Sequence, residues 1–312
     1  MKKIEKCILC GAKELKFLFY GEDKNFNLPG KFPIVECEEC GLISLGVSIN
    51  SKDASSHYPP EYYSFKDLDT NSQKFRTKLE MYNCYFNKKN KNWMKRIFLS
   101  PLIPFIRGTV IEKGKKLLDV GCGSGQFLYE MKQFNIKGQG LEPGDFNEEQ
   151  NHKYGLNIKK KNLLEVKYPK ESFDLITMNH VLEHVENPTK NIKEVYRILK
   201  RGGNFIIAVP NKRSLAYFLL KKDWYQLDTP RHVNNFSDEL LKKNLEKEGF
   251  KIDKVRYNSR PTQFTISFLY LLSINPKRHS LLRGALNLFF LPLTYLVNAI
   301  KLGDQIEVWC SK

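Results

Sequence analysis

The sequence predicts an α/β fold in which helices cover a mostly parallel sheet. Three observations support this fold class. From residue 115 onward, short apolar runs alternate with longer segments of helical periodicity. A glycine-rich turn follows the first apolar run, at residues 121–125. Glycine or proline marks most of the later boundaries. Strands separated by helices imply a parallel sheet with right-handed crossovers.

Each element follows from its local pattern. The expected strands are 116–120, 138–142, 173–178, 204–209, 251–257 and 305–310. The expected helices are 127–134, 147–154, 188–200 and a fourth that Ser237 caps and that runs to Lys247. Pro188 suits a first helical turn, and Gly155 and Gly249 follow helix ends, where glycine is favoured.

Composition and charge are those of a globular protein. The chain has 312 residues, of which 41% are hydrophobic and 27% charged, enough for one sizeable core and a small accessory domain. The formal net charge is +17. Because the lysines are spread along the chain, a solvated surface is favoured over a patch for nucleic acid, a membrane face or a phosphorylated substrate.

The expected organisation has three parts. Residues 1–50 form a zinc-ribbon-like module, 51–112 a linker and helical lid, and 113–312 the main domain. Within the main domain, 211–236 is expected to be an acceptor-site insertion and 261–303 an apolar helical insertion. The lid would contain a helical stretch at 73–98 and the aromatic segment 58–63, for which plain packing is the alternative.

Four cysteines near the start form two CxxC pairs. Cys7 and Cys10 make the first, Cys37 and Cys40 the second, and a glycine follows each pair. Four thiolates at this spacing suit a structural zinc ion. The first residues lack the apolar stretch of a secretory signal, which predicts a reducing, cytoplasmic setting where such pairs bind metal.

Residues 264–300 are unusually apolar, but charged and polar residues interrupt them before about 20 apolar residues accumulate. Helices buried in the fold or against another subunit are the favoured interpretation. A hairpin lying on a membrane, with Lys277 and Arg278 at the headgroups, is the second. A true span is the third. The sequence leaves the oligomeric state open.

The glycine-rich turn is the most informative segment. Gly121, Gly123 and Gly125 follow the expected strand 116–120, which contains Asp119, and a helix begins directly after them. Such a turn lets a ligand approach the backbone closely. A dinucleotide fingerprint would place its third glycine one residue later, at position 126. Glu142 ends the next strand, where a carboxylate can bind ribose hydroxyls.

This set resembles the class I S-adenosylmethionine-dependent methyltransferase family, in its small-molecule, ubiquinone-type branch. The first motif is 119–125, and the resemblance continues through 173–185 and 199–203. It implies a Rossmann-like, mostly parallel seven-stranded sheet with helices on both faces. It also implies S-adenosylmethionine as cofactor, held by Asp119, Gly121, Gly123, Gly125, Glu142, Asn162, Leu163 and Asn179. The resemblance places Asn162 and Leu163 near the adenine; Asn162 stands where many members have Asp, and its amide oxygen keeps an acceptor there.

The methyl acceptor is constrained by what the chain lacks. Base-amino methyltransferases carry an Asp/Asn-Pro-Pro-Tyr/Phe motif at the end of the fourth strand, where this chain has Met178-Asn179-His180-Val181. No Pro-Cys pair occurs in the chain either, and both absences disfavour nucleic acid. His180, His184 and His232 are candidate bases, with His232 favoured because it lies in the 211–236 insertion. For His184, a bond to backbone is the structural alternative. Arg231 is expected either to bind a phosphate or carboxylate of the acceptor or to form an ordinary surface ion pair.

These features predict methyl transfer to oxygen or carbon of a small molecule, such as a sugar or a lipid-linked surface-polysaccharide precursor. Two other functions remain open: an RNA methyltransferase guided by the zinc module, and a non-catalytic protein that kept the cofactor fold. The layout of the chain looks like that of bacterial methyltransferases that modify sugars, which is an argument by analogy.

Overall fold

The computed structural model describes residues 2–48, 56–59, 62, 66–70, 94, 114–132 and 136–312. The expected helical stretch at 73–98 lies outside these residues except for Met94. Most of the expected lid also lies outside them, although Tyr58 and Tyr62 are described.

A seven-stranded sheet forms the centre of the molecule, in the order β12-β13-β10-β9-β6-β7-β8. Its strands are β6 (Lys116–Val120), β7 (Lys137–Leu141), β8 (Asn157–Lys159), β9 (Phe173–Asn179), β10 (Leu199–Pro210), β12 (Lys251–Tyr257) and β13 (Gln305–Ser311). Strands β10, β9, β6, β7 and β8 pair in parallel, whereas β13 is antiparallel to both of its neighbours. The predicted mostly parallel seven-stranded fold is confirmed.

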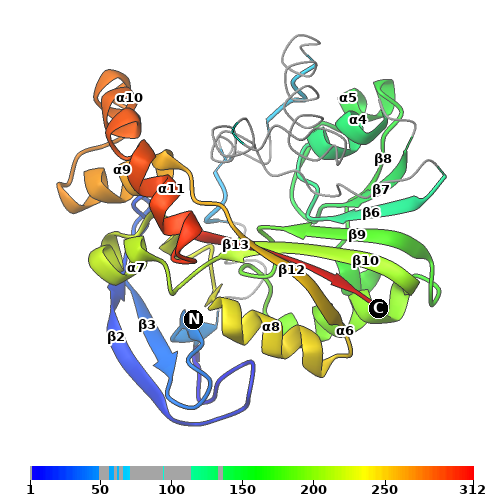
Figure 1. Ribbon diagram of the computed structural model, residues 1–312, viewed down its shortest axis with the longest axis horizontal. Coiled ribbons are helices and arrows are strands. Elements are labelled where there is room, and N and C mark those ends of the chain that lie inside the picture. The colour runs from blue at the N-terminus through cyan, green and yellow to red at the C-terminus, as the bar shows by residue number, and fades with distance from the viewer. Residues whose placement is uncertain are drawn as a thin grey trace.

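Helices cover both faces of this sheet (Figure 1). On one face lie α6 (Pro188–Ile198) and α8 (Asp238–Lys247), whose Val195 and Leu241 are fully buried in the main core. On the other lies α4 (Gln126–Lys132), whose Leu128 belongs to a second cluster with Leu117. Helix α5 (Glu148–Lys153) begins at Asn147, whose side chain caps it. The alternation of inward positions along each strand supplies both cores.

The N-terminal module is built on a four-stranded antiparallel sheet in the order β11-β4-β3-β2. Strands β2 (Leu15–Gly21), β3 (Phe32–Cys37) and β4 (Ile43–Leu45) come from the module itself. Strand β11 (Asn234–Asn235) comes from the insertion after β10 and pairs with β4. A two-stranded sheet of β1 (Lys2–Lys3) and β5 (Val47–Ser48) completes the module. The insertion and the module therefore share one sheet.

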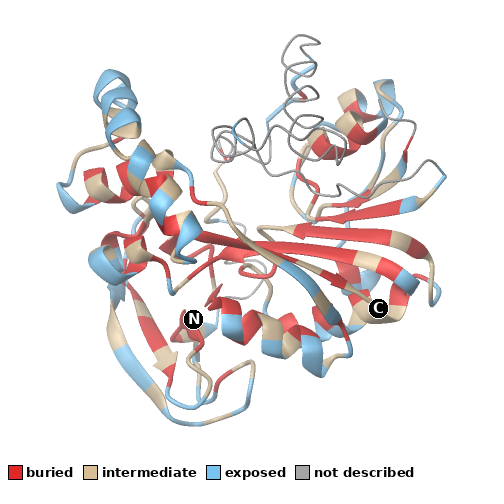
Figure 2. Ribbon diagram, viewed as in Figure 1, coloured by how far each residue is buried: buried red, intermediate tan, exposed pale blue. Residues whose placement is uncertain are grey.

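The apolar insertion near the C-terminus is helical, as expected. It contains α9 (Pro261–Leu271), α10 (Ser280–Phe289) and α11 (Leu291–Ala299). Phe264 of α9 and Val297 of α11 join a core with Phe32 and Trp224, between α7 (Leu215–Leu220) and the N-terminal sheet. Helix α10 has no buried residue (Figure 2). Burial within the fold therefore holds for α9 but not for α10, and packing of α10 against another subunit stays a prediction.

No single helix among the described residues is both long and apolar enough to cross a bilayer. Helices α10 and α11 reach that length and apolarity only as a pair, and they are bent by 47° at the break between them.

Candidate functional site

The predicted glycine loop and the segment after β9 lie next to each other at the centre of the sheet. The chain runs from β6 to β7 and β8 in one direction, and β9 and β10 lie on the other side of β6. The strand order therefore reverses between β6 and β9. In open α/β sheets, ligands bind outside the carboxyl ends of the strands at such a point.

The glycine loop has backbone dihedral angles that residues with a Cβ rarely adopt. Gly121 has φ 66° and Gly125 has φ 86°, both in the left-handed region. A Cβ on Gly121 would lie 2.3 Å from the Val181 side chain, and one on Gly125 would lie 2.6 Å from Ile158. The loop is thus packed closely against the segment that follows β9. Gly123, also at positive φ (55°), directs its N–H to Glu142.

Glu142 follows β7, and its carboxylate is fixed on the glycine loop. One carboxylate oxygen accepts the Gly123 N–H at 2.8 Å and the other accepts the Gly144 N–H at 2.9 Å. Burial raises the pKa of Glu142, and nearby Asp119 adds to this, although the two N–H groups oppose it. Asp119 itself is fully buried and accepts a 2.6 Å hydrogen bond from the Thr177 hydroxyl, which joins β6 to β9 beneath the loop.

The other predicted cofactor residues occupy different environments. Asn179 ends β9, and its buried side-chain oxygen has no hydrogen-bond partner among the described residues. Asn162 caps the 3-10 turn η2 (Leu163–Glu165), and its side-chain oxygen accepts the N–H of Leu164 at 3.1 Å. Leu163 belongs to the main core. The Asn162 oxygen that the sequence offered to adenine is therefore already engaged in the cap.

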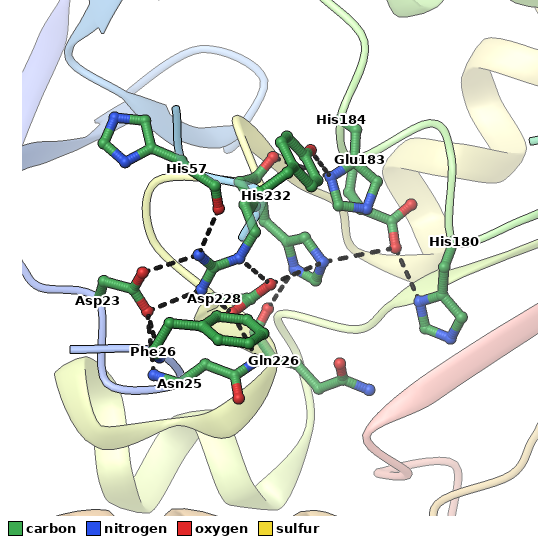
Figure 3. A network of polar contacts seen from close by, with 12 residues as sticks. Asp23, Asn25, Phe26, His57, His180, Glu183, His184, Gln226, Asp228 and His232 are labelled. Atoms are coloured by element: carbon green, nitrogen blue, oxygen red, sulfur yellow. Dashed lines mark hydrogen bonds and ion pairs between the residues drawn. The ribbon is translucent and has the colours of Figure 1, made fainter. Parts of the chain in front are cut away.

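His184 and His232 come together beside Glu183, with ring centroids 4.7 Å apart (Figure 3). His184 Nδ1 lies 2.9 Å from the Arg231 carbonyl oxygen, and His232 Nδ1 lies 2.7 Å from that of Gln226. A carbonyl only accepts, so we assign the protons of both rings to Nδ1, which leaves both Nε2 lone pairs available. His184 thus has the backbone bond that the sequence offered as its structural role.

The two histidines, His184 and His232, have different electrostatic environments. Burial, and then the neighbouring His232, lower the pKa of His184 to about 4, so its ring is neutral at physiological pH. His232 Nε2 lies 4.0 Å from a carboxylate oxygen of Glu183 and 4.0 Å from one of Asp228. Burial is the largest single effect on Glu183 and disfavours its charged form. The hydrogen bond from His180 and the electrostatic effects of His180, His232 and His184 together outweigh burial and lower the pKa of this carboxyl. Two carboxylates therefore face one imidazole.

The same group has metal-ligand spacing. The ligating atoms of Glu183, His184 and His232 all lie within 4.8 Å of one another, so these three residues could hold one ion. The second Glu183 oxygen is buried without a hydrogen-bond partner among the described residues. His180, the third candidate base, instead holds Glu183: its Nδ1 is 2.8 Å from the carboxylate, and its Nε2 contacts the Gln305 side chain.

Arg231 is not available to bind the substrate that accepts the methyl group, so one of the two roles expected for it is wrong. Its side chain is fully buried, and five hydrogen bonds of 2.6–3.0 Å run from its guanidinium to Asp23, to Asp228 and to the His57 carbonyl. A guanidinium has five N–H donors, so none is left for a ligand. The ion pair is also buried rather than on the surface, and it connects the N-terminal module to the insertion.

Sequence reasoning missed the partners in this network. Asp228 lies three residues before Arg231 and four before His232, so its proximity to both was a usable signal. Asp23 lies 208 residues from Arg231, and nothing in the local pattern connects them. Tyr58, in the segment proposed as a lid, places its hydroxyl 3.2 Å from His184 Nδ1.

The four N-terminal cysteines form one cluster. Their sulfurs all lie within 4.8 Å of one another, and the Cys7–Cys40 and Cys10–Cys37 pairs are each 3.6 Å apart. A tetrahedral zinc ion with Zn–S bonds of about 2.3 Å separates its sulfurs by roughly 3.8 Å. The residue after each pair, Gly11 or Gly41, donates its N–H to the carbonyl of the first cysteine, at 2.9 and 2.8 Å. The two turns are thus equivalent, and the donor set fits zinc.

Comparisons with known proteins identify a methyltransferase domain in this chain. A family described as a methyltransferase domain matches residues 93–255. An uncharacterized protein of Methanocaldococcus jannaschii is 31% identical over 141 residues, which cover 45% of this chain and 66% of that protein. The ubiquinone biosynthesis O-methyltransferase of Pseudomonas entomophila is 32% identical over 130 residues, covering 39% of this chain and 56% of the enzyme. The chain thus spans less than two thirds of each of these relatives.

A crystal structure described as a SAM-dependent methyltransferase, possible histamine N-methyltransferase, from Thermotoga maritima is 20% identical with a TM-score of 0.47, covering 77% of this chain and 97% of that one. The family match leaves the cysteine module and helices α9–α11 outside its bounds. It spans just over half of the chain and contains both the glycine loop and Glu142. This chain belongs to the class I S-adenosylmethionine-dependent methyltransferase family.

Proposed function

We propose that the chain binds S-adenosylmethionine over the glycine loop and transfers its methyl group to a small molecule. The single observation that carries the cofactor site is the pair of acceptors on either side of the loop. Glu142 is fixed by the Gly123 N–H, and the Asn179 oxygen is buried without a partner among the described residues. These two acceptors suit the ribose hydroxyls and the ammonium group of the cofactor. When bound, the cofactor supplies an electrophilic methyl group.

We propose His232 as the base that removes a proton from an acceptor hydroxyl. Its Nδ1–H is directed to the Gln226 carbonyl, so Nε2 is the atom that takes the proton. The carboxylates of Glu183 and Asp228, each 4.0 Å away, would stabilise the imidazolium that results. His184 has the weaker claim, because an imidazole with a pKa of about 4 holds a proton poorly. The buried Arg231 ion pairs fix the backbone directly before His232.

For the acceptor we propose a hydroxylated sugar or lipid-linked precursor. The chain lacks the motifs of nucleic-acid methyltransferases, and the named ubiquinone relative is an O-methyltransferase of small-molecule biosynthesis. For the N-terminal module we propose a structural zinc ion bound by Cys7, Cys10, Cys37 and Cys40, supported by the spacing of their sulfurs. Its role would be to hold the sheet that β11 completes.

The cofactor site is tested by isothermal titration calorimetry with S-adenosylmethionine. Gly123→Val places a β-branched side chain at φ 55° beside Glu142 and should weaken binding at least tenfold. Gly202→Val is the matched control, because Gly202 also has positive φ (71°) but a Cβ there meets nothing within 4 Å. Equal affinities in the two variants would place the cofactor elsewhere.

The base is tested by transfer of labelled methyl to a panel of sugar nucleotides and polyprenyl-linked sugars. His232→Ala should retain cofactor affinity and lose turnover by about 10²-fold or more, the usual contribution of a general base. Unchanged turnover in this variant would remove His232 from the mechanism. Transfer to RNA but to no member of the panel would favour the alternative in which the zinc module guides an RNA methyltransferase.

A further inference from the structure

The surface of α10 and α11 has an inverted polarity. Between residues 281 and 300, every polar side chain is at least partly covered, and every exposed residue is apolar or glycine. The covered polar residues are Arg283, Asn287, Thr294, Tyr295 and Asn298. The exposed set, which we call the apolar ridge, is Leu281, Leu282, Gly284, Ala285, Leu288, Phe289, Pro292, Leu296, Ala299 and Ile300. Water-soluble surface helices normally show the opposite arrangement.

The ridge runs continuously over both helices. Leu281, Ala285 and Leu288 follow one another at steps of three or four residues, which places them on one face of α10. Pro292 and Leu296 share one face of α11 in the same way. Three large side chains of the ridge are mostly exposed: Leu281 is 89% exposed, Leu288 73% and Phe289 74%. Helix α10 projects away from the central sheet (Figure 1). An apolar surface of this extent marks a site of interaction.

The rest of the fold holds these helices so that the ridge faces outward. Phe290 stacks on Phe264 of α9, with ring centroids 6.1 Å apart, whereas the adjacent Phe289 remains exposed. Asn298 of α11 accepts the N–H of Ser259 at 2.7 Å and donates to its carbonyl at 3.1 Å. The polar side of α11 is therefore committed to the body of the protein, and the exposed side is its apolar one.

Every charged residue of the helical insertion that carries the ridge is basic. From residue 261 to 303 the sequence contains no Asp or Glu. Lys277 and Arg278 precede α10 and Lys301 follows α11, and all three are exposed. Basic residues therefore lie at both ends of an uncharged apolar stripe. This arrangement complements the anionic headgroups and the acyl region of a lipid surface.

We propose that the apolar ridge binds the surface of a membrane containing anionic lipids, with α10 and α11 in the plane of the interface. The polar side of α11 is bonded to Ser259 in the body of the protein, so only one side of this helix is available to lipid, which favours this in-plane arrangement. The proposal goes beyond methyl transfer and does not depend on it, because membrane binding is measured without turnover.

The test is co-sedimentation of the full-length protein with vesicles of phosphatidylcholine alone or with 30% phosphatidylglycerol. The wild type should bind the anionic vesicles and lose affinity in high salt. Leu288→Glu/Phe289→Glu should weaken binding at least tenfold. Leu164→Glu is the matched control, because Leu164 is 43% exposed on a different part of the surface, and its affinity should be unchanged.

A second pair of substitutions tests the charges. Arg278→Gln/Lys301→Asn should weaken binding to anionic vesicles roughly 25-fold, since each basic residue near a membrane contributes about fivefold. Asn is used at position 301 because Lys301 has φ 65°, which Asn tolerates. Circular dichroism and S-adenosylmethionine affinity should match the wild type in every variant, which shows that folding is intact.

Three results would overturn the proposal. The wild type could fail to bind anionic vesicles, or the ridge variant could bind as well as the Leu164 variant. Light scattering could also show a dimer that Leu288→Glu/Phe289→Glu converts to a monomer. In that last case the ridge is an interface between two copies of the chain.

Discussion

Replacing Arg231 with methionine should destabilise the protein more than any exposed ion-pair substitution. The guanidinium is fully buried and directs five hydrogen bonds to Asp23, Asp228 and a carbonyl. Methionine keeps most of the apolar stem but removes the charge and every donor. The variant therefore leaves two buried carboxylates without their cation.

The expected loss follows from this geometry. Removing one partner of a buried ion pair costs about 3–5 kcal/mol, because the other charge remains buried and unpaired. Two carboxylates are left here rather than one, so we expect the upper part of that range, about 4–5 kcal/mol. The exposed pair of Arg201 and Glu171, 3.7 Å apart, provides the comparison. Arg201→Met should cost less than about 1 kcal/mol.

Urea denaturation at pH 7 measures both free energies of unfolding. The double variant Arg231→Met/Asp23→Asn should recover part of the loss, because one uncompensated carboxylate is removed. The deficit of Arg231→Met should also shrink as the pH falls, because burial raises the pKa of Asp228 once the guanidinium that lowers it is gone. A loss for Arg231→Met as small as that for Arg201→Met would refute the view that this network stabilises the fold.

Three further outcomes are expected. Cys10→Ser should abolish bound zinc, measured by inductively coupled plasma mass spectrometry, whereas Cys310→Ser should leave about one ion per chain; zinc retained by Cys10→Ser would contradict the four-cysteine site. Because the folded-state pKa of His184, about 4, lies below the ordinary value, stability should fall as the pH drops from about 6.5 toward 4. His184→Gln should flatten that dependence in urea titrations, and an unchanged slope would assign it to other groups. Burial raises the pKa of Asp304 to about 6, so its charge opposes folding at higher pH. Asp304→Asn keeps an acceptor for the Trp224 N–H and should stabilise the protein by about 1–3 kcal/mol at pH 8 but not at pH 4; equal effects at both pH values would show that Asp304 is not protonated in this range.

The sequence predicted the elements whose signals are local. Strands β6 and β12 have the predicted bounds, and Ser237 caps α8 as expected, because apolar periodicity and capping residues act over a few positions. Strand β8 was missed because its Asn-Ile-Lys sequence lies at a sheet edge and carries no apolar pattern. Strand β11 was missed because only two residues pair with β4.

In the candidate site, too, the residues that are close in sequence could be predicted, whereas the contacts between distant segments could not. The glycine loop and Glu142 are close in sequence to the strands that carry them, and the structure brings them together. The pairing of Arg231 with Asp23 depends on two segments 208 residues apart, which no periodicity records. Hydropathy also could not distinguish α10 from a buried helix, because an outward and an inward apolar face have the same composition.

The shared sheet of β4 and β11 limits how this chain can be divided. A truncation that begins at Gly114 would keep all seven strands of the central sheet but remove the neighbour of Asn234 and Asn235. Their backbone amides would then lie at a bare strand edge, and Arg231 would lose one of its two acidic partners next to His232. The cysteine module is therefore not an appendage that can be exchanged among relatives. It and the loop before α8 must be inherited, deleted or redesigned as one unit.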